Sequence, residues 1–106
     1  MKLQGHIVIP DAKLTQYLLV PLPENDKSKF LARAGFTQDN PDRLKQAIFN
    51  LIQSYDAITD RYDRYGRYYR VEGNLVGPNC SLAVVTIWIE RASDRLIQFV
   101  TLKPKR

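Results

Sequence analysis

The sequence concentrates arginine and tyrosine, two residue types that together can bind RNA, in one short stretch. Four arginines and four tyrosines lie within residues 61–70, and the single acid Asp63 reduces the charge of this stretch from +4 to +3. An arginine guanidinium offers a planar fork to a phosphate, and a tyrosine ring offers a surface on which a base can stack. The residues that we expect to contact nucleic acid are Arg61, Arg64, Tyr65, Tyr68 and Arg70.

The same stretch has a plainer interpretation as an exposed β-hairpin. Residues 63–66 have the composition of a hairpin turn, and tyrosine is a good strand former. The arginines would then pair with the nearby acids Asp60, Asp63 and Glu72 on a solvated surface. Both interpretations remain open at the level of the sequence.

A second candidate site lies on the apolar segment 81–90. Alternation places one purely apolar set on a single face, which we expect to meet the helices: Ala83, Val85, Ile87 and Ile89. The opposite face mixes Thr86, Trp88 and Glu90, and with Thr101 of the next strand it can line a substrate groove. The alternatives are an oligomer contact or a small hydrophobic layer covered by the N-terminal segment.

Metal and cofactor sites find little support in the residue types. The chain has one histidine, His6, and one cysteine, Cys80, which is expected to be a small apolar strand residue. The five glycines are scattered and form no phosphate-binding loop. The sequence therefore predicts neither a metal site nor a bound cofactor.

Length and charge restrict the remaining possibilities. A chain of 106 residues fits one domain over residues 1–106, and its net charge of +5 favours RNA or a small acidic protein as partner. No apolar run approaches the length of a membrane span, and the first residues lack the apolar core of a signal peptide. We therefore expect a cytoplasmic protein without membrane contact.

The clearest predicted element is a helix over residues 41–54. Asn40 is a good N-cap residue, and Pro41 suits the first helical position. Apolar residues then recur at intervals of three and four and form one stripe: Leu44, Ala47, Ile48, Leu51 and Ile52.

Shorter elements precede this helix. Residues 3–9 can form a short strand, and a helix can run from residue 10 through residue 18 until the prolines within 20–23 end it. A further short helix is predicted over 27–34, with Asp26 as its cap.

Strand-like segments fill the C-terminal half, over residues 57–62, 67–73, 81–90 and 95–102. Their short links favour an antiparallel meander, and helices followed by strands favour an α+β fold. We expect N-terminal helices packed on a four-stranded antiparallel sheet. The residues predicted to be mutually buried are Ile48, Leu51, Val85, Ile87 and Ile89.

Several segments resemble a family of small uncharacterised bacterial proteins, the domain of unknown function six-eight-eight-three. Residues 27–36 match its pattern of a lysine, a small residue, two aromatic or apolar residues and a Gly-Phe pair. The resemblance continues through residues 66–78, 85–88 and 99–104. It implies no established activity. The family's layout is similar to the compact nucleases of the barnase, EndoU, colicin and RelE group, which include toxins paired with antitoxins.

This sequence departs from the family pattern at three places. Ser28 replaces the usual alanine, Leu31 replaces the second phenylalanine, and Leu102-Lys103 replaces a small-aromatic pair. The last departure leaves the end of the final strand outside the resemblance.

Two functional hypotheses follow. The first is a metal-independent ribonuclease of toxin type, in which Lys27, Arg67 and Tyr69 act at the ribose 2′-hydroxyl and the phosphate. The substrate groove would be lined by Thr86, Trp88 and Thr101. The second is a non-catalytic interaction module, either an antitoxin-like or immunity-like partner or a small homodimer. The ribonuclease hypothesis requires the catalytic and groove residues to converge on one open cleft.

Overall fold

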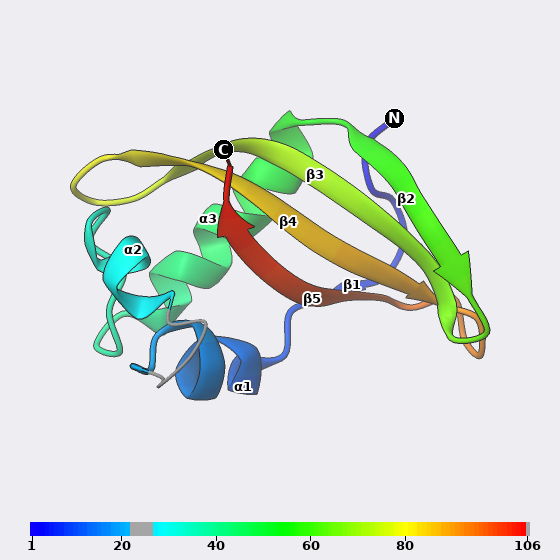
Figure 1. Ribbon diagram of the computed structural model, residues 1–106, viewed down its shortest axis with the longest axis horizontal. Coiled ribbons are helices and arrows are strands. Elements are labelled where there is room, and N and C mark those ends of the chain that lie inside the picture. Colours follow the sequence, from blue (N-terminus) through cyan, green and yellow to red (C-terminus); the bar gives the residue numbers. More distant parts are fainter. Residues whose placement is uncertain (22–26, 106) are drawn as a thin grey trace.

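A five-stranded sheet organises the chain, whose residues 1–21 and 27–105 are described by a computed structural model (Figure 1). In spatial order the strands are β1 (Ile7–Val8), β5 (Ile97–Pro104), β4 (Ser81–Arg91), β3 (Gly66–Val76) and β2 (Ala57–Asp63). The predicted antiparallel meander of β2 to β5 is confirmed. The prediction of four strands is incomplete, because β1 pairs with β5 in parallel and adds a fifth strand.

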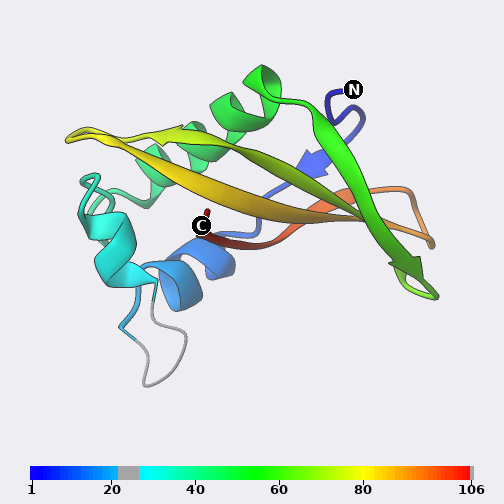
Figure 2. The same ribbon diagram turned by 45° about the horizontal axis from the view of Figure 1, so that its top comes forward.

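Helices cover one face of this sheet. The helix α3 (Pro41–Ser54) has the predicted bounds, and its five predicted stripe residues are all buried. Before it come α1 (Asp11–Lys13), the π-helical turn η1 (Leu14–Leu18) and α2 (Ser28–Ala32). Figure 2 shows α1, η1 and α2, in blue and cyan, gathered at one end of the sheet. Their buried residues Leu14, Leu18 and Leu31 belong to the same core cluster as those of α3. The predicted cap Asp26 lies outside the described residues.

Asn40 begins α3 without capping it through its side chain. Its side-chain oxygen accepts a hydrogen bond from the backbone N–H of Thr37 at 2.8 Å, and its amide donates to the backbone oxygen of Gly35 at 2.9 Å. Only the backbone oxygen of Asn40 serves the helix, by accepting from Arg43 N–H at 3.0 Å. Asn40 therefore occupies the predicted N-cap position, but its side chain fixes the preceding turn and does not cap the helix.

The face of β4 that packs against the helices is opposite to the predicted one. Thr86 and Trp88 are fully buried, whereas Ile87 and Ile89 are only partly buried on the other face. The Thr86 hydroxyl donates to the Val71 backbone oxygen at 2.9 Å and accepts from Trp88 Nε1 at 2.9 Å. Because the polar side-chain atoms of both residues are hydrogen-bonded, burying Thr86 and Trp88 costs little free energy. The predicted mutual burial of Val85, Ile87 and Ile89 with Ile48 and Leu51 is therefore wrong. Val85 is buried, but it lies on the same face as Ile87 and outside the core cluster.

Two smaller observations complete the fold. Cys80, expected in a strand, is exposed in the turn between β3 and β4, where its Sγ lies 3.4 Å from the Arg33 backbone oxygen. Within residues 1–21 and 27–105, no helix has both the length and the apolar character needed to cross a membrane.

Candidate functional site

The sheet has one face on which no helix of the described chain packs, and we call it the open face. Figure 1 views it with α3 behind the strands. Strand register places three rows of side chains across it: Arg61, Tyr68, Ile89 and Gln98; Ile58, Arg70, Ile87 and Thr101; and Glu72, Val85 and Lys103. The open face therefore has an aliphatic centre with cationic and aromatic side chains around it.

Three polar side chains from distant parts of the sequence meet at the edge of the open face. Lys27 Nζ lies 2.8 Å from Thr101 Oγ1 and 3.1 Å from Tyr17 Oη, to both of which it donates. Tyr17 Oη and Thr101 Oγ1 are 3.2 Å apart, and all three contacts are partly buried. We call this group the Lys27 cluster.

Local structure explains why Tyr17 reaches Thr101. The strand β1 pairs with β5 only at Ile97 and Gln98, so no described strand pairs with that edge of β5 beyond them. The chain then turns into η1, which buries Leu14 and Leu18 in the core. Tyr17, on a different side of that turn, is left beside the uncovered part of β5.

The surroundings of Tyr17 lower its pKa below the ordinary value of 10. The hydrogen bond with Thr101 is the largest cause, the hydrogen bond and positive charge of Lys27 add to it, and burial opposes both. Lys27 Nζ and Lys13 Nζ also lie 5.3 and 5.6 Å from the centre of the Tyr17 ring. The cluster thus combines an ammonium group with a phenol that loses its proton more readily than usual.

A basic hollow of about 490 Å³ lies further along the open face. Glu72 there faces two cations: its Oε2 is 2.9 Å from Arg70 Nε, outside good hydrogen-bond alignment, and its Oε1 is 3.5 Å from Lys105 Nζ. Lys103 lines the same hollow without an ion pair to any residue that the structure describes. The hollow therefore carries more positive than negative charge.

The arginine–tyrosine hairpin is largely paired with itself. The Arg61 guanidinium lies 3.8 Å from the centre of the Tyr68 ring and 3.1 Å from Asp63 Oδ2. Arg64 lies over the ring of Tyr65, at 4.8 Å, and donates to its hydroxyl at 2.7 Å. Many of these contacts are therefore internal to an exposed hairpin, as the plainer of the two interpretations of the sequence predicts.

A tight turn holds this hairpin. Asp63 Oδ1 accepts the backbone N–H of Tyr65 at 2.9 Å, and this hydrogen bond, followed by the contact with Arg61, lowers the pKa of Asp63. Gly66 has a φ of +157°, and a Cβ there would collide with the Glu90 backbone oxygen. Glycine is therefore required where β3 crosses β4 this closely.

The predicted catalytic residues do not converge. The structure brings Lys27 and Thr101 together, but Tyr69 is 8% exposed on the opposite, helix-covered face, and Arg67 lies at the exposed end of β3. Thr86 and Trp88 belong to the core, so the prediction that they line a substrate groove is wrong. The alternative of a small separate layer under the N-terminal segment does not describe their position either, because Trp88 belongs to the same core cluster as the buried residues of α3.

Sequence reasoning missed Tyr17 and Lys13. Tyr17 sits at helical spacing between Leu14 and Leu18, which makes it look like one more apolar helix position. The available signal was its phenol group, which needs a polar partner when it is partly buried.

The described residues contain no group of three or more His, Cys, Asp or Glu side chains that could hold a metal ion. No curated protein and no solved structure is significantly similar to the chain. Residues 2–106 match the family model described as Domain of unknown function (DUF6883), which confirms the resemblance found in the sequence. The chain is therefore a member of the DUF6883 family.

Proposed function

We propose that this protein is a metal-independent endoribonuclease whose active site is the Lys27 cluster on the open face. The observation that carries the proposal is the contact of an ammonium, a phenol of lowered pKa and a hydroxyl beside an uncovered basic surface. RNA fits this surface because cations bind its phosphates and exposed rings can stack on its bases.

The reaction would need only groups that the cluster supplies. Tyr17, as phenolate, takes the proton of the ribose 2′-hydroxyl, and the 2′-oxygen attacks the adjacent phosphorus. The new P–O2′ bond replaces the P–O5′ bond, and the departing 5′-oxygen takes a proton from Lys27. The charge of Lys27 stabilises the developing negative charge on the phosphorane. The products are a 2′,3′-cyclic phosphate and a 5′-hydroxyl.

The test is cleavage of unstructured RNA by the purified protein in the presence of EDTA. Lys27→Met removes the charge with little change of shape, and Tyr17→Phe removes only the hydroxyl. Each should lower the rate by roughly 100- to 10,000-fold, the usual contribution of a positioned acid or base. Lys29→Met, which changes an exposed lysine two residues away, is the matched control and should cleave at the wild-type rate. Wild-type activity in both Lys27→Met and Tyr17→Phe would contradict the proposal.

A second candidate function is a protein-interaction module. It is favoured by the aliphatic centre of the open face, where Ile58 is 52% exposed and Ile87 and Ile89 are partly exposed. A small acidic protein or a second copy of the chain would fit this surface. Sedimentation of the protein over a range of concentrations, with Ile58→Asp as the comparison, tests the homodimer.

The toxin role implied by the nuclease-like layout is a separate prediction. Production of the wild-type chain in bacteria should arrest growth, whereas Lys27→Met should not. Equal growth of the two cultures would remove the toxin role and leave the ribonuclease test unaffected.

A further inference from the structure

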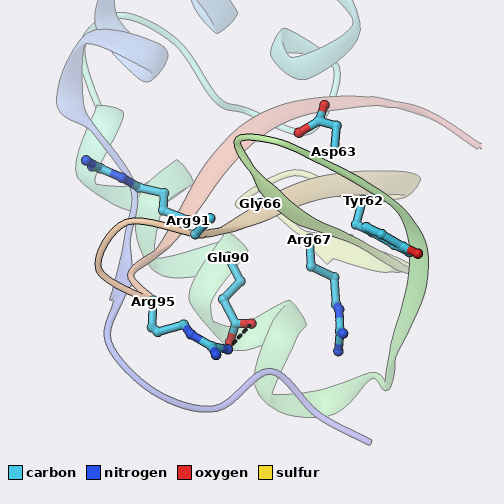
Figure 3. Close-up of a pocket in the computed structure, with 8 residues that line it drawn as sticks. Tyr62, Asp63, Gly66, Arg67, Glu90, Arg91 and Arg95 are labelled. Atoms are coloured by element: carbon cyan, nitrogen blue, oxygen red, sulfur yellow. Dashed lines mark ion pairs between the residues drawn. The ribbon is translucent and has the colours of Figure 1, made fainter.

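A hollow of about 220 Å³ lies where the β2–β3 and β4–β5 turns meet, away from the Lys27 cluster (Figure 3). The two turns are joined by a hydrogen bond from Ala92 N–H to the Tyr65 backbone oxygen at 2.9 Å. Tyr62, Arg67, Glu90 and Arg95 point to the same side of these turns in Figure 3. The volume is smaller than that of typical pockets for drug-sized ligands, so it suits one small group.

Arg67 lines this hollow without an ion pair to any residue that the structure describes. Arg95 pairs with Glu90 at 3.6 Å and Arg91 pairs with Asp94 at 3.5 Å, whereas the Arg67 guanidinium has no ion pair or hydrogen bond with any described residue. Its cross-strand neighbours are Tyr62 on β2, whose side chain is 78% exposed, and Glu90 on β4, whose carboxylate pairs with Arg95. A guanidinium that makes no ion pair, next to an accessible ring, matches a phosphate and an unpaired base.

The hollow adjoins a second hollow at the tip of the sheet. It shares Arg91 and Ala92 with this second hollow of about 390 Å³, which Lys13 also lines. Lys13 in turn lies against the ring of Tyr17 in the Lys27 cluster. Two adjoining hollows, one lined by Arg67 and one by Lys13, therefore lie beside one another at the tip of the sheet.

From these adjoining hollows and the free guanidinium of Arg67 we propose that the Arg67–Tyr62 hollow is a remote subsite for one nucleotide of a single-stranded RNA bound at the Lys27 cluster. This inference rests on the proposed function, because it takes RNA as the ligand of the open face. Arg67 holds the phosphate and Tyr62 stacks on the base, which must be unpaired to offer its face. Short RNAs that fill only the cluster do not reach this subsite.

The experiment measures binding of 2′-O-methyl oligonucleotides, which lack the 2′-hydroxyl and cannot be cleaved. Oligonucleotides of two and of eight residues are compared for wild type, Arg67→Ala and Tyr62→Leu. Tyr62→Leu should weaken binding of the long oligonucleotide roughly 5- to 150-fold with little change in its salt dependence. Arg67→Ala should weaken it as well and make the salt slope shallower by roughly one unit. Binding of the short oligonucleotide should not change in either variant.

Arg43→Ala, an exposed arginine on α3, is the control for the lost charge. Equal weakening by Arg43→Ala and Arg67→Ala, or equal weakening for both oligonucleotide lengths, would overturn the subsite. Cleavage of ordinary RNA is measured separately. Length-dependent binding without cleavage would support the subsite and contradict the catalytic proposal. Cleavage of RNA, together with unchanged binding of the long oligonucleotide by Arg67→Ala, would support the catalytic proposal and contradict the subsite.

Discussion

The two faces of the sheet differ in burial, and the difference is the opposite of what their residue types alone suggest. The covered face buries Thr86 and Trp88 completely, whereas the open face displays Ile87 and Ile89 at its centre. The covered face can hold polar atoms because Thr86 bonds both the Val71 carbonyl and Trp88 Nε1. The open face leaves aliphatic side chains accessible beside cations. An apolar set marks a core only when other elements cover it, and here the helices cover the other side.

The largest expected effect comes from removing the centre of the covered face. Trp88 is fully buried and contacts Phe99 edge to face, with ring centres 5.3 Å apart. Trp88→Ala should lower the free energy of unfolding by about 3–5 kcal/mol. Ile87→Ala on the open face should lower it by only about 1 kcal/mol, since its side chain is partly exposed. Urea unfolding of both variants checks the difference, and a larger loss for Ile87→Ala would reverse the assignment of the faces.

A smaller effect should come from the buried hydroxyl of the covered face. Thr86→Val keeps the shape of the side chain but leaves Trp88 Nε1–H without its acceptor. We expect a loss of about 1–3 kcal/mol in the free energy of unfolding. Thr101→Val, the corresponding change on the open face, should cost less, because water can replace its partly buried contacts. Equal costs in chemical denaturation would show that the two threonines have similar surroundings.

How far the sequence predicted this structure depends on whether local or tertiary contacts decided each feature. The helix over 41–54 was predicted with its bounds, because its proline start and apolar stripe are local signals. The covered face of β4 was not, because alternation defines two faces without saying where the helices will lie. Of the three residues of the Lys27 cluster, the sequence indicates Lys27 and Thr101 as candidate site residues. Tyr17 is brought to them only by tertiary structure, so the sequence does not indicate it.

The lowered pKa of Tyr17 gives a dependence of stability on pH. A phenol whose folded pKa is lower than its unfolded value of 10 adds stability at high pH, and this stability is lost as pH falls through the folded pKa. The free energy of unfolding of wild type minus that of Tyr17→Phe should therefore increase from pH 7 toward pH 10. Urea unfolding at several pH values measures it. A difference that shrinks with rising pH would contradict the lowered pKa.

The smallest effect concerns single cations of the open face. Lys103→Ala should make the salt dependence of RNA binding shallower by slightly less than one unit, the release of about one counterion. Lys45→Ala on α3, where the lysine pairs with Asp11 at 3.1 Å, should leave the slope unchanged. Filter binding at several salt concentrations provides both slopes. A change confined to Lys45→Ala would place the RNA on the helix side.

The most direct test of the open face as the functional surface is a methyl NMR titration with an uncleavable 2′-O-methyl oligonucleotide. The account predicts shifts for the methyl groups of Val85, Ile87 and Ile89, which lie on the open face. The methyl groups of Leu75 and Val84, buried on the covered face, should move little. Shifts confined to Leu75 and Val84, or none at any of the five residues at saturating oligonucleotide, would contradict the account.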